Sequence, residues 1–228
     1  MTDIPITAET WTPCYRIVPS RYPPISLFER VADPADLEAV FSVEGLTNDR
    51  LRQEVGDLNL VPPEERQTGH GTTPIMAAFT HLPPYQTRFS DGSYGVYYAS
   101  RSEATAIKET VYHRERFMRH GRQGPMDLEM RAYLSDVAGE FHDIRGARFA
   151  ASPWYHPEDY SASLILGRSL REKKSWGILY NSVRHDGGEC IGVFRTPVLK
   201  PCRQGKHYIY RWNGSRISDV LAVKSMVL

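Results

Sequence analysis

The stretch from Thr87 to Tyr112, TRFSDGSYGVYYASRSEATAIKETVY, contains three residue types that could form one small site. Arg88 can bind phosphate oxygens through two parallel hydrogen bonds. Tyr98 offers an aromatic ring that can stack on a planar ligand. Glu109 carries a carboxylate that can stabilise positive charge developing in a transition state. The combination predicts a site that holds a diphosphate, stacks on a ring and stabilises a cationic transition state.

A strand followed by a helix is expected to position these side chains. Asp91-Gly92-Ser93 has the composition of a turn, because Gly tolerates positive φ and Asp bonds its own backbone. Residues 94–99 are aromatic and β-branched, which predicts a strand. Ser100 and Glu103 have the S-x-x-E spacing of a capping box, so a helix is expected to begin there.

Within that helix, Ala104, Ile107 and Val111 recur at helical spacing and are predicted to face the core. Glu109 lies about 200° around the helix from Ile107 at 3.6 residues per turn. A glutamate off the apolar stripe is commonly just solvated, and Arg88 alone could be a surface charge. Only their combination with the tyrosine-rich strand favours a site.

Other segments predict further strands and helices. Residues 14–18 are expected to form a strand that carries Arg16. Strict alternation of apolar and polar residues predicts a half-buried strand over 126–134, and another strand is expected near 141–144. A helix is expected from His156-Pro157 to about residue 174. The basic run from His113 to Arg122 is predicted to be a solvated helix end.

Two strands, 177–183 and 190–195, are joined by RHDGGE, which predicts a hairpin with a Gly-rich loop. Ser182 lies at the mouth of this loop. Arg184 and His185 could hold a phosphate there, although the loop could also be an ordinary hairpin tip.

Asn213-Gly214 predicts a second hairpin between 208–212 and 215–223. Helices are expected at 33–41, at 47–58 and from Thr73-Pro74 onward, within a helical and loop embellishment at about 26–84. The chain is therefore predicted to be one α+β domain over residues 1–228, with mostly antiparallel sheet.

Composition excludes several classes of function. The net charge of the 228 residues is +1, which does not indicate a broad surface for nucleic acid. The three cysteines are widely spaced and no zinc-binding spacing occurs, so neither a disulfide framework nor a metal site is expected. No apolar run is long enough to cross a membrane, and the N-terminus is not a secretory signal. We expect a cytoplasmic protein.

Several short motifs occur in a characteristic order: Y-R-I near the start, R-F-S-D-G with V-Y-Y-A-S, A-x-x-E-T, and L-Y-N-S-V-R-H-D-G-G with C-I-G-V-F. Together they resemble the RES-domain family over residues 14–198. The resemblance implies a fold similar to the ADP-ribosyltransferase toxins, with two packed, mostly antiparallel sheets and flanking helices around a cleft for NAD⁺. It also implies a toxin that consumes NAD⁺, paired with an Xre-like helix-turn-helix antitoxin that covers the active site.

Five positions match the functional residues of the family. Arg16 matches the early arginine, Arg88 the family arginine, Tyr98 the strand tyrosine, Glu109 the helix glutamate and Ser182 the serine. By this resemblance Glu109, Arg88 and Tyr98 are the expected catalytic residues. Arg16, Arg88, Tyr98 and Ser182 are the expected contacts to NAD⁺.

Two positions depart from the family pattern. The family often has Gly before the arginine and Asn two residues after it, where this chain has Thr87 and Ser90. The backbone of this turn is therefore expected to differ.

One carboxylate suffices for the expected reaction. Nicotinamide leaves ribose as a neutral molecule, so no acid is needed to protonate it, in contrast to ordinary glycoside hydrolysis. Glu109 would stabilise the oxocarbenium-like ribose, while Arg88 and Arg16 clamp the diphosphate. Tyr98 would shape the nicotinamide pocket, and Ser182 would position a ribose hydroxyl or the carboxamide.

The acceptor of the ADP-ribosyl group stays open between water, inorganic phosphate and a protein side chain. Position 107 is Ile, whereas transferases that modify arginine carry a second acid there, so an arginine acceptor is disfavoured. Phosphorolysis or hydrolysis of NAD⁺ is favoured, and ADP-ribosylation of a cellular protein is the alternative. A non-catalytic binding module is a further alternative, and an RNA-cleaving toxin is disfavoured by the near-neutral charge.

Overall fold

A computed structural model describes residues 3–20, 56–83 and 85–224 of the chain. Its strands are β1 (Ile6–Pro19), β2 (Tyr97–Ser100), β3 (Met126–Asp143), β4 (Gly177–Asn181), β5 (Glu189–Val193), β6 (Arg203–Trp212) and β7 (Ile217–Val223). Its α-helices are α3 (Thr73–Thr80), α4 (Glu103–His120) and α5 (Ser161–Glu172). Short 3₁₀ turns are η1 (Leu58–Leu60), η2 (Pro63–Glu65), η3 (Ala147–Phe149), η4 (Pro153–Tyr155) and η5 (Thr196–Val198).

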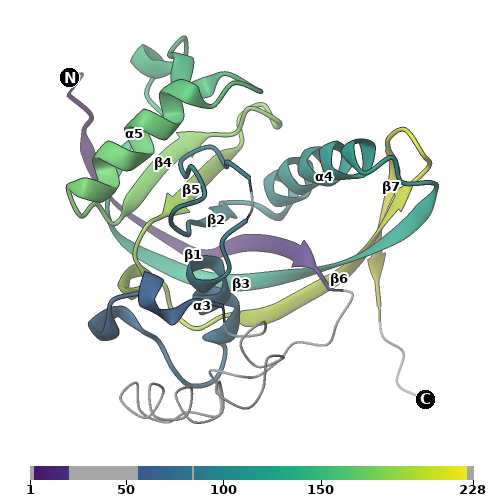
Figure 1. The fold of residues 1–228 in the computed structure, drawn as a ribbon, viewed down its shortest axis with the longest axis horizontal. Coiled ribbons are helices and arrows are strands. Elements are labelled where there is room, and N and C mark those ends of the chain that lie inside the picture. Colours follow the sequence, from purple (N-terminus) through teal and green to yellow (C-terminus); the bar gives the residue numbers. More distant parts are fainter. Residues whose placement is uncertain (1–2, 21–55, 84, 225–228) are drawn as a thin grey trace.

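The described strands form one hydrogen-bonded sheet in the order β1-β2-β5-β4-β3-β6-β7, and β1 also pairs with β3. The first five strands therefore close into a ring. Apart from the parallel pair β3–β4, all pairs are antiparallel, which confirms the predicted α+β class. Two separate sheets were expected. The structure shows a single sheet, because the long strand β1 pairs with β2 and the long strand β3 pairs with β4 (Figure 1).

Three groups of buried side chains lie on the two surfaces of this sheet. The inner group lies within the ring and includes Trp11, Cys14, Tyr97, Val137, Leu179 and Ile191, with Ile75, Met76 and Phe79 of α3. A second group lies under α5 and includes Phe89, Val96, Leu166, Leu170, Ile178 and Tyr180. A third lies under α4 and includes Ile17, Ala106, Met130, Ala132, Tyr208 and Tyr210. Burial on both surfaces of the central strands is what fixes their register.

Helix α4 starts two residues later than its sequence predicts. Ser102 is the N-cap, and its hydroxyl oxygen accepts a hydrogen bond from the backbone N–H of Thr105. Ser100 pairs instead with Cys190 in the β2–β5 ladder, so the predicted capping box at Ser100 is wrong. Ala104 is also exposed, and Ala106 takes the core position in its place.

Two other predicted elements have different bounds. The strands expected at 126–134 and 141–144 are one strand, β3, because the backbone between them pairs with β1. The helix expected from residue 157 begins at Ser161, after the turn η4. The hairpin at Asn213-Gly214 is confirmed: Oδ1 of Asn213 accepts from the N–H groups of Ser215 and Arg216.

The helix expected at 33–41, and most of the one expected at 47–58, lie outside the described residues. The helix predicted from Thr73 is confirmed as α3. Its residues Ile75 and Met76 are fully buried in the inner group, so the described part of region 26–84 contributes to the core. Among the described residues, no helix has the length and apolarity needed to cross a membrane.

Candidate functional site

Glu109 and Ser182 form the centre of the candidate site. Oγ of Ser182 donates to Oε1 of Glu109 over 2.6 Å. The same hydroxyl oxygen accepts hydrogen bonds from the backbone N–H groups of Arg184 at 3.1 Å and His185 at 3.0 Å. Since these two bonds use the lone pairs of the hydroxyl, its hydrogen points to the carboxylate. The Glu109 side chain is 19% exposed, so it is open on one side.

The loop after β4 is fastened to the first turn of α4. Nδ1 of His185 lies 2.9 Å from the hydroxyl of Thr105. A Cβ at Gly188 would lie 2.8 Å from the Thr105 side chain, so only glycine fits this approach. The loop therefore sets the position of Ser182 relative to Glu109. Nδ1 of His185 is therefore already hydrogen-bonded, which leaves Nε2 to contact a phosphate. The expected role of His185 as a phosphate ligand stays a prediction.

Arg184 lies along the rim of the site. Its guanidinium carbon is 3.3 Å from the centre of the Tyr112 ring, and Nη2 donates to the carbonyl of Pro157. Stacking on an aromatic ring leaves a guanidinium charged and oriented. Arg184 therefore presents a fixed positive charge next to α4.

Arg88 is 8% exposed and is held by the segment before α5. Nη1 donates to the carbonyls of Trp154 at 2.9 Å and His156 at 3.2 Å. The guanidinium lies 4.8 Å from the centre of the Tyr160 ring. These contacts orient the charge without neutralising it, because none of the three partners is a carboxylate.

The charges of Arg88 and Glu109 both act on the buried thiol of Cys190. Burial and, to a smaller extent, the negative charge of Glu109 raise the pKa of Cys190 to about 12, while the positive charge of Arg88 opposes this rise. Sγ of Cys190 is 3.9 Å from Oε1 of Glu109. Glu109 therefore borders this thiol, and Arg88 lies near enough for its charge to act on the same thiol. That Arg88 and Glu109 share one ligand site stays a prediction.

Tyr98 fastens the turn that carries Arg88. Its hydroxyl accepts from the backbone N–H of Phe89 at 2.9 Å and lies 2.9 Å from the Thr87 hydroxyl. Burial raises the pKa of Tyr98 above its usual range. Thr87, a departure from the family pattern, therefore supplies a partner that Gly would lack. Stacking of Tyr98 on a nicotinamide ring stays a prediction.

The structure places Arg16 on the surface of β1 opposite to the one that α4 covers. Its guanidinium lies 4.8 Å from the centre of the Tyr97 ring, and Nη1 donates to the Tyr98 carbonyl at 3.1 Å. Cys14, two residues earlier, points into the inner group, and Ile17 points toward α4. Arg16 therefore supports β2 in these contacts, and its expected role in binding NAD⁺ stays a prediction.

His113 lies next to the carboxylate and was not among the predicted site residues. Its Nε2 is 4.0 Å from Oε2 of Glu109, and 51% of its side chain is exposed. Burial, followed by the positive charges of Arg184, Arg114 and Arg88, lowers the pKa of His113 to about 4. Because half of the side chain is exposed to solvent, we attribute the lowered pKa mainly to the positive charges of the arginines and less to burial. The i,i+4 spacing from Glu109 is the signal that could have identified it.

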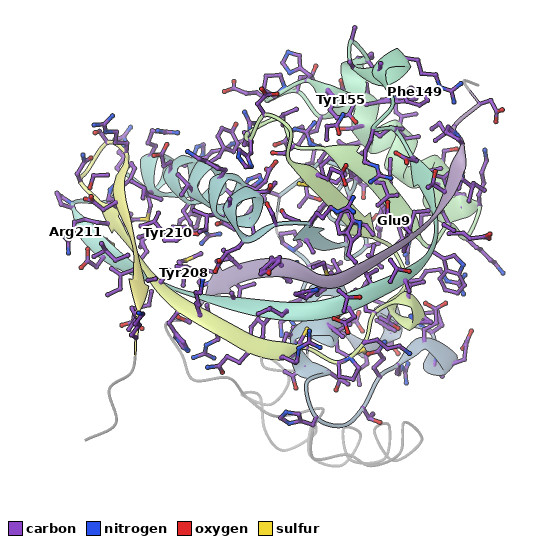
Figure 2. The ribbon with its side chains drawn as sticks, turned by 180° about the vertical axis from the view of Figure 1, so that it is seen from behind. Glu9, Phe149, Tyr155, Tyr208, Tyr210 and Arg211 are labelled. Carbon is purple, nitrogen blue, oxygen red and sulfur yellow. The ribbon has the colours of Figure 1, made fainter. Side chains whose placement is uncertain are left out.

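Two tyrosines of β6 hold α4 in place (Figure 2). The hydroxyl of Tyr210 lies 2.8 Å from that of Thr110, the residue after Glu109. The hydroxyl of Tyr208 donates to Oε1 of Glu103 in the first turn. Side chains of α4 are therefore bound to β6 in the first turn of the helix and at the residue that follows Glu109.

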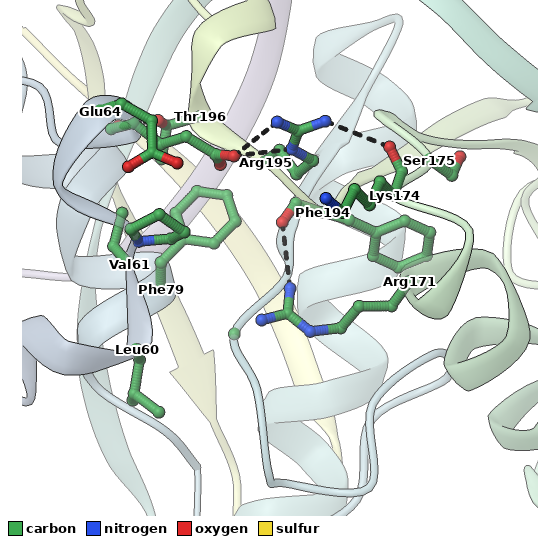
Figure 3. A pocket seen from close by; sticks show the side chains of 13 residues that line it. Leu60, Val61, Glu64, Phe79, Arg171, Lys174, Ser175, Phe194, Arg195 and Thr196 are labelled. Atoms are coloured by element: carbon green, nitrogen blue, oxygen red, sulfur yellow. Dashed lines mark hydrogen bonds and ion pairs between the residues drawn. The ribbon is translucent and has the colours of Figure 1, made fainter.

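A hollow of about 260 Å³, which none of the predicted site residues lines, lies at the end of β4 and β5 away from Ser182 (Figure 3). Arg195 forms an ion pair with Glu65 at 2.6 Å on its wall. Arg171 donates to the carbonyl of Phe194 at 3.4 Å. The cations and carboxylates of this hollow largely offset one another. Within the described part of the chain, no cluster of three or more His, Cys, Asp or Glu side chains could hold a metal ion.

The sequence of the chain was compared with those of known protein families and proteins. The model of the RES domain matches residues 64–213, which contain Arg88, Tyr98, Glu109 and Ser182. The "Uncharacterized protein y4oC" of Sinorhizobium fredii (strain NBRC 101917 / NGR234) is 32% identical over 211 residues, covering 91% of this chain and 86% of that protein.

Among solved structures, the chain is similar to one chain of the crystal structure of the M. tuberculosis MbcT-MbcA toxin-antitoxin complex. The TM-score is 0.44 at 11% identity, and the match covers 91% of this chain and 86% of that chain. The match to the domain model and the 32% identity to a relative that is covered over most of its length lead to one conclusion. The chain belongs to the RES-domain family.

Proposed function

We propose that this protein is the toxin of a type II toxin-antitoxin system and that it depletes NAD⁺ by cleaving the bond between nicotinamide and ribose. The observation that carries the proposal is the carboxylate of Glu109, fixed by Ser182 and flanked by Arg88 and Arg184. A single fixed anion among fixed cations suits a substrate with a cationic ring and an anionic diphosphate. Membership of the RES-domain family supports the same substrate.

The proposed reaction follows from the charge of the leaving group. The electrons of the bond between C1′ and the pyridinium nitrogen pass to the ring, which departs as neutral nicotinamide. The ribose then carries the positive charge, and the carboxylate of Glu109 stabilises it. A preorganised group of this kind contributes roughly 3–4 kcal/mol to the barrier reduction. The hydrogen bond from Ser182 keeps the carboxylate oriented before substrate binds.

Arg88 and Arg184 are proposed to receive the diphosphate. Each guanidinium is already held by carbonyl oxygens and an aromatic ring. Side chains that are ordered in advance lose little conformational entropy when a ligand binds. Arg16 would act on the same ligand only from the far side of β2, so we give it a secondary, supporting role.

The proposed biological setting is cytoplasmic. An Xre-like helix-turn-helix antitoxin would cover the site and prevent entry of NAD⁺ until the antitoxin is lost. The cationic rim at Arg184 and Arg114 would meet acidic side chains of that partner. Inorganic phosphate is a candidate acceptor at Arg184 and His185.

Mass spectrometry of the products tests the function directly. NAD⁺ would be incubated with purified protein alone, with inorganic phosphate, and with cell lysate. ADP-ribose, ADP-ribose phosphate or a modified protein would identify water, phosphate or a side chain as the acceptor. A modified protein would favour the alternative ADP-ribosyltransferase. Intact NAD⁺ under all three conditions would contradict an enzyme and favour a non-catalytic binding module.

A further inference from the structure

The two oxygens of the Glu109 carboxylate have different surroundings. Oε1 accepts the hydrogen bond from Ser182. Oε2 faces Nε2 of His113 at 4.0 Å. This separation is too long for a direct hydrogen bond. It does allow one oxygen atom to lie about 2.8 Å from both Oε2 and Nε2. A water molecule placed there would donate one hydrogen to the carboxylate and the other to the imidazole.

The groups that face His113 favour its neutral form. Tyr112 packs against the ring edge to face, with the ring centres 5.3 Å apart. One carboxylate lies nearby, and several positive charges surround the ring. The facing charged groups are Glu109, Arg114 and Arg116 on α4, Arg184 on the loop after β4, and Arg88 on the turn before β2. Because the cations outnumber the carboxylate, an imidazolium is disfavoured, so the lone pair of Nε2 is free at neutral pH. The same charges make the imidazole a weak base, which accepts a proton only from a water molecule made more acidic by its forming bond to the cationic ribose.

We propose that His113 is the base for water as the acceptor, so that this site hydrolyses NAD⁺. The inference rests on the proposed function. The oxygen of the water molecule forms a bond to C1′ as the bond from C1′ to nicotinamide breaks. Nicotinamide leaves with the bonding electrons, and one proton of the water passes to Nε2 of His113. The imidazolium then releases this proton to solvent, which gives ADP-ribose, nicotinamide and H⁺.

An anionic acceptor would not need His113. Azide carries no proton to remove, and its attack on C1′ yields ADP-ribosyl azide and nicotinamide. Monohydrogen phosphate is likewise already charged at neutral pH. His113 therefore speeds the reaction only when water is the acceptor. Glu109 speeds cleavage of the bond to nicotinamide whichever acceptor is used.

The test compares His113→Gln with wild type, with Glu109→Gln and with His120→Gln, a matched histidine change in the exposed last turn of the same helix. Release of nicotinamide and of ADP-ribose would be measured with and without sodium azide, and melting temperatures would show that each variant is folded. For His113→Gln we expect kcat for hydrolysis to fall by about 100-fold with KM for NAD⁺ little changed. Azide would restore its nicotinamide release, but not that of Glu109→Gln, and His120→Gln would match wild type.

Three results would overturn the inference. The first is hydrolysis by His113→Gln at the wild-type rate, and the second is a loss that azide does not restore. The third is a wild-type protein that releases nicotinamide only when phosphate is present. In each of these cases wild type still cleaves NAD⁺, so the proposed function stands. A wild-type protein that leaves NAD⁺ intact with water, phosphate and azide would instead refute the proposed function, and the inference with it.

Discussion

The hydroxyl of Ser182 donates a hydrogen bond of 2.6 Å to the carboxylate of Glu109, across a sequence separation of 73 residues. The bond joins the loop after β4 to the middle of α4. It has a fixed direction because the same oxygen accepts two backbone N–H groups. The position of the carboxylate is therefore set by the fold rather than by the substrate, which is the condition for electrostatic stabilisation of a transition state.

Glu109→Gln keeps the size of the side chain and its bond from Ser182 but removes the charge. We expect NAD⁺ turnover to fall by about two to three orders of magnitude, from the loss of roughly 3–4 kcal/mol of stabilisation. The rate of nicotinamide release measures this. Glu140→Gln, on an exposed position of β3, is the control and should keep wild-type activity. Near-full NAD⁺ consumption by Glu109→Gln would show that another group carries the chemistry.

Ser182→Ala removes a donor to Glu109 and the acceptor for two backbone N–H groups. We expect the free energy of unfolding to fall by about 1–3 kcal/mol and kcat to fall at least tenfold, because the carboxylate is no longer oriented. Thermal unfolding and steady-state kinetics would measure both. Ser218→Ala, exposed on β7, should change neither quantity much. A variant with full activity and lowered stability would limit Ser182 to holding the loop.

Arg88→Lys tests whether the guanidinium shape matters as well as the charge. A lysine cannot donate to Trp154 and His156 and also bind phosphate with two parallel bonds. We expect KM for NAD⁺ to rise by about tenfold or more, in line with the loss of one charge-assisted bond. The defect should be smaller with nicotinamide mononucleotide, which carries one phosphate. Equal defects for both substrates would argue against a diphosphate contact.

The structure brings together Glu109 and Ser182, two residues that the family motifs assign to one site, but the sequence did not indicate how each is held. The β2 strand, α4 and the hairpin of β4 and β5 follow from local composition, and the family motifs paired Glu109 with Ser182. The start of α4 was misplaced because both Ser100 and Ser102 are good caps. Pairing of β2 with β5 takes Ser100 into the sheet, and this is a tertiary effect that local spacing does not contain.

Strand β1 shows why the placement of Arg16 could not be predicted. Trp11 and Cys14 are three residues apart, yet both point into the inner group. The register against β3 shifts between them, and a one-residue shift turns every later side chain to the other surface. His113 was missed for a different reason. Its role depends on Arg184, which the loop after β4 brings to the helix, and the basic run around it has the composition of a solvated helix end.

The three thiols should be unreactive in the folded protein. Cys14, Cys190 and Cys202 are all buried, and burial raises the pKa of Cys14 and Cys190 to about 12 and that of Cys202 above its usual value. Since the thiolate is the reactive form, we expect no labelling by a disulfide reagent at pH 8. Three labels should appear in denaturant. Fast labelling of one thiol in the native protein would contradict the described packing.

The pKa of His113 predicts how stability changes with pH. It is about 4 in the folded chain, against about 6.5 for an unperturbed histidine. Between these values the unfolded chain binds more protons, so stability rises with pH across this window and is fully present above about pH 6.5. Solvent screening reduces the size of this effect, because half of the His113 side chain is exposed.

The measurement is the melting temperature of wild type and of His113→Gln from pH 4 to 8. We expect both proteins to lose stability as the pH falls, because other groups titrate, including His142, whose pKa burial also lowers. The wild-type curve should fall more steeply between pH 6.5 and 4, since only wild type must keep residue 113 neutral among the arginines. The difference between the two curves isolates His113, and parallel curves would mean that the positive charges of Arg184 and Arg88 do not act on this ring.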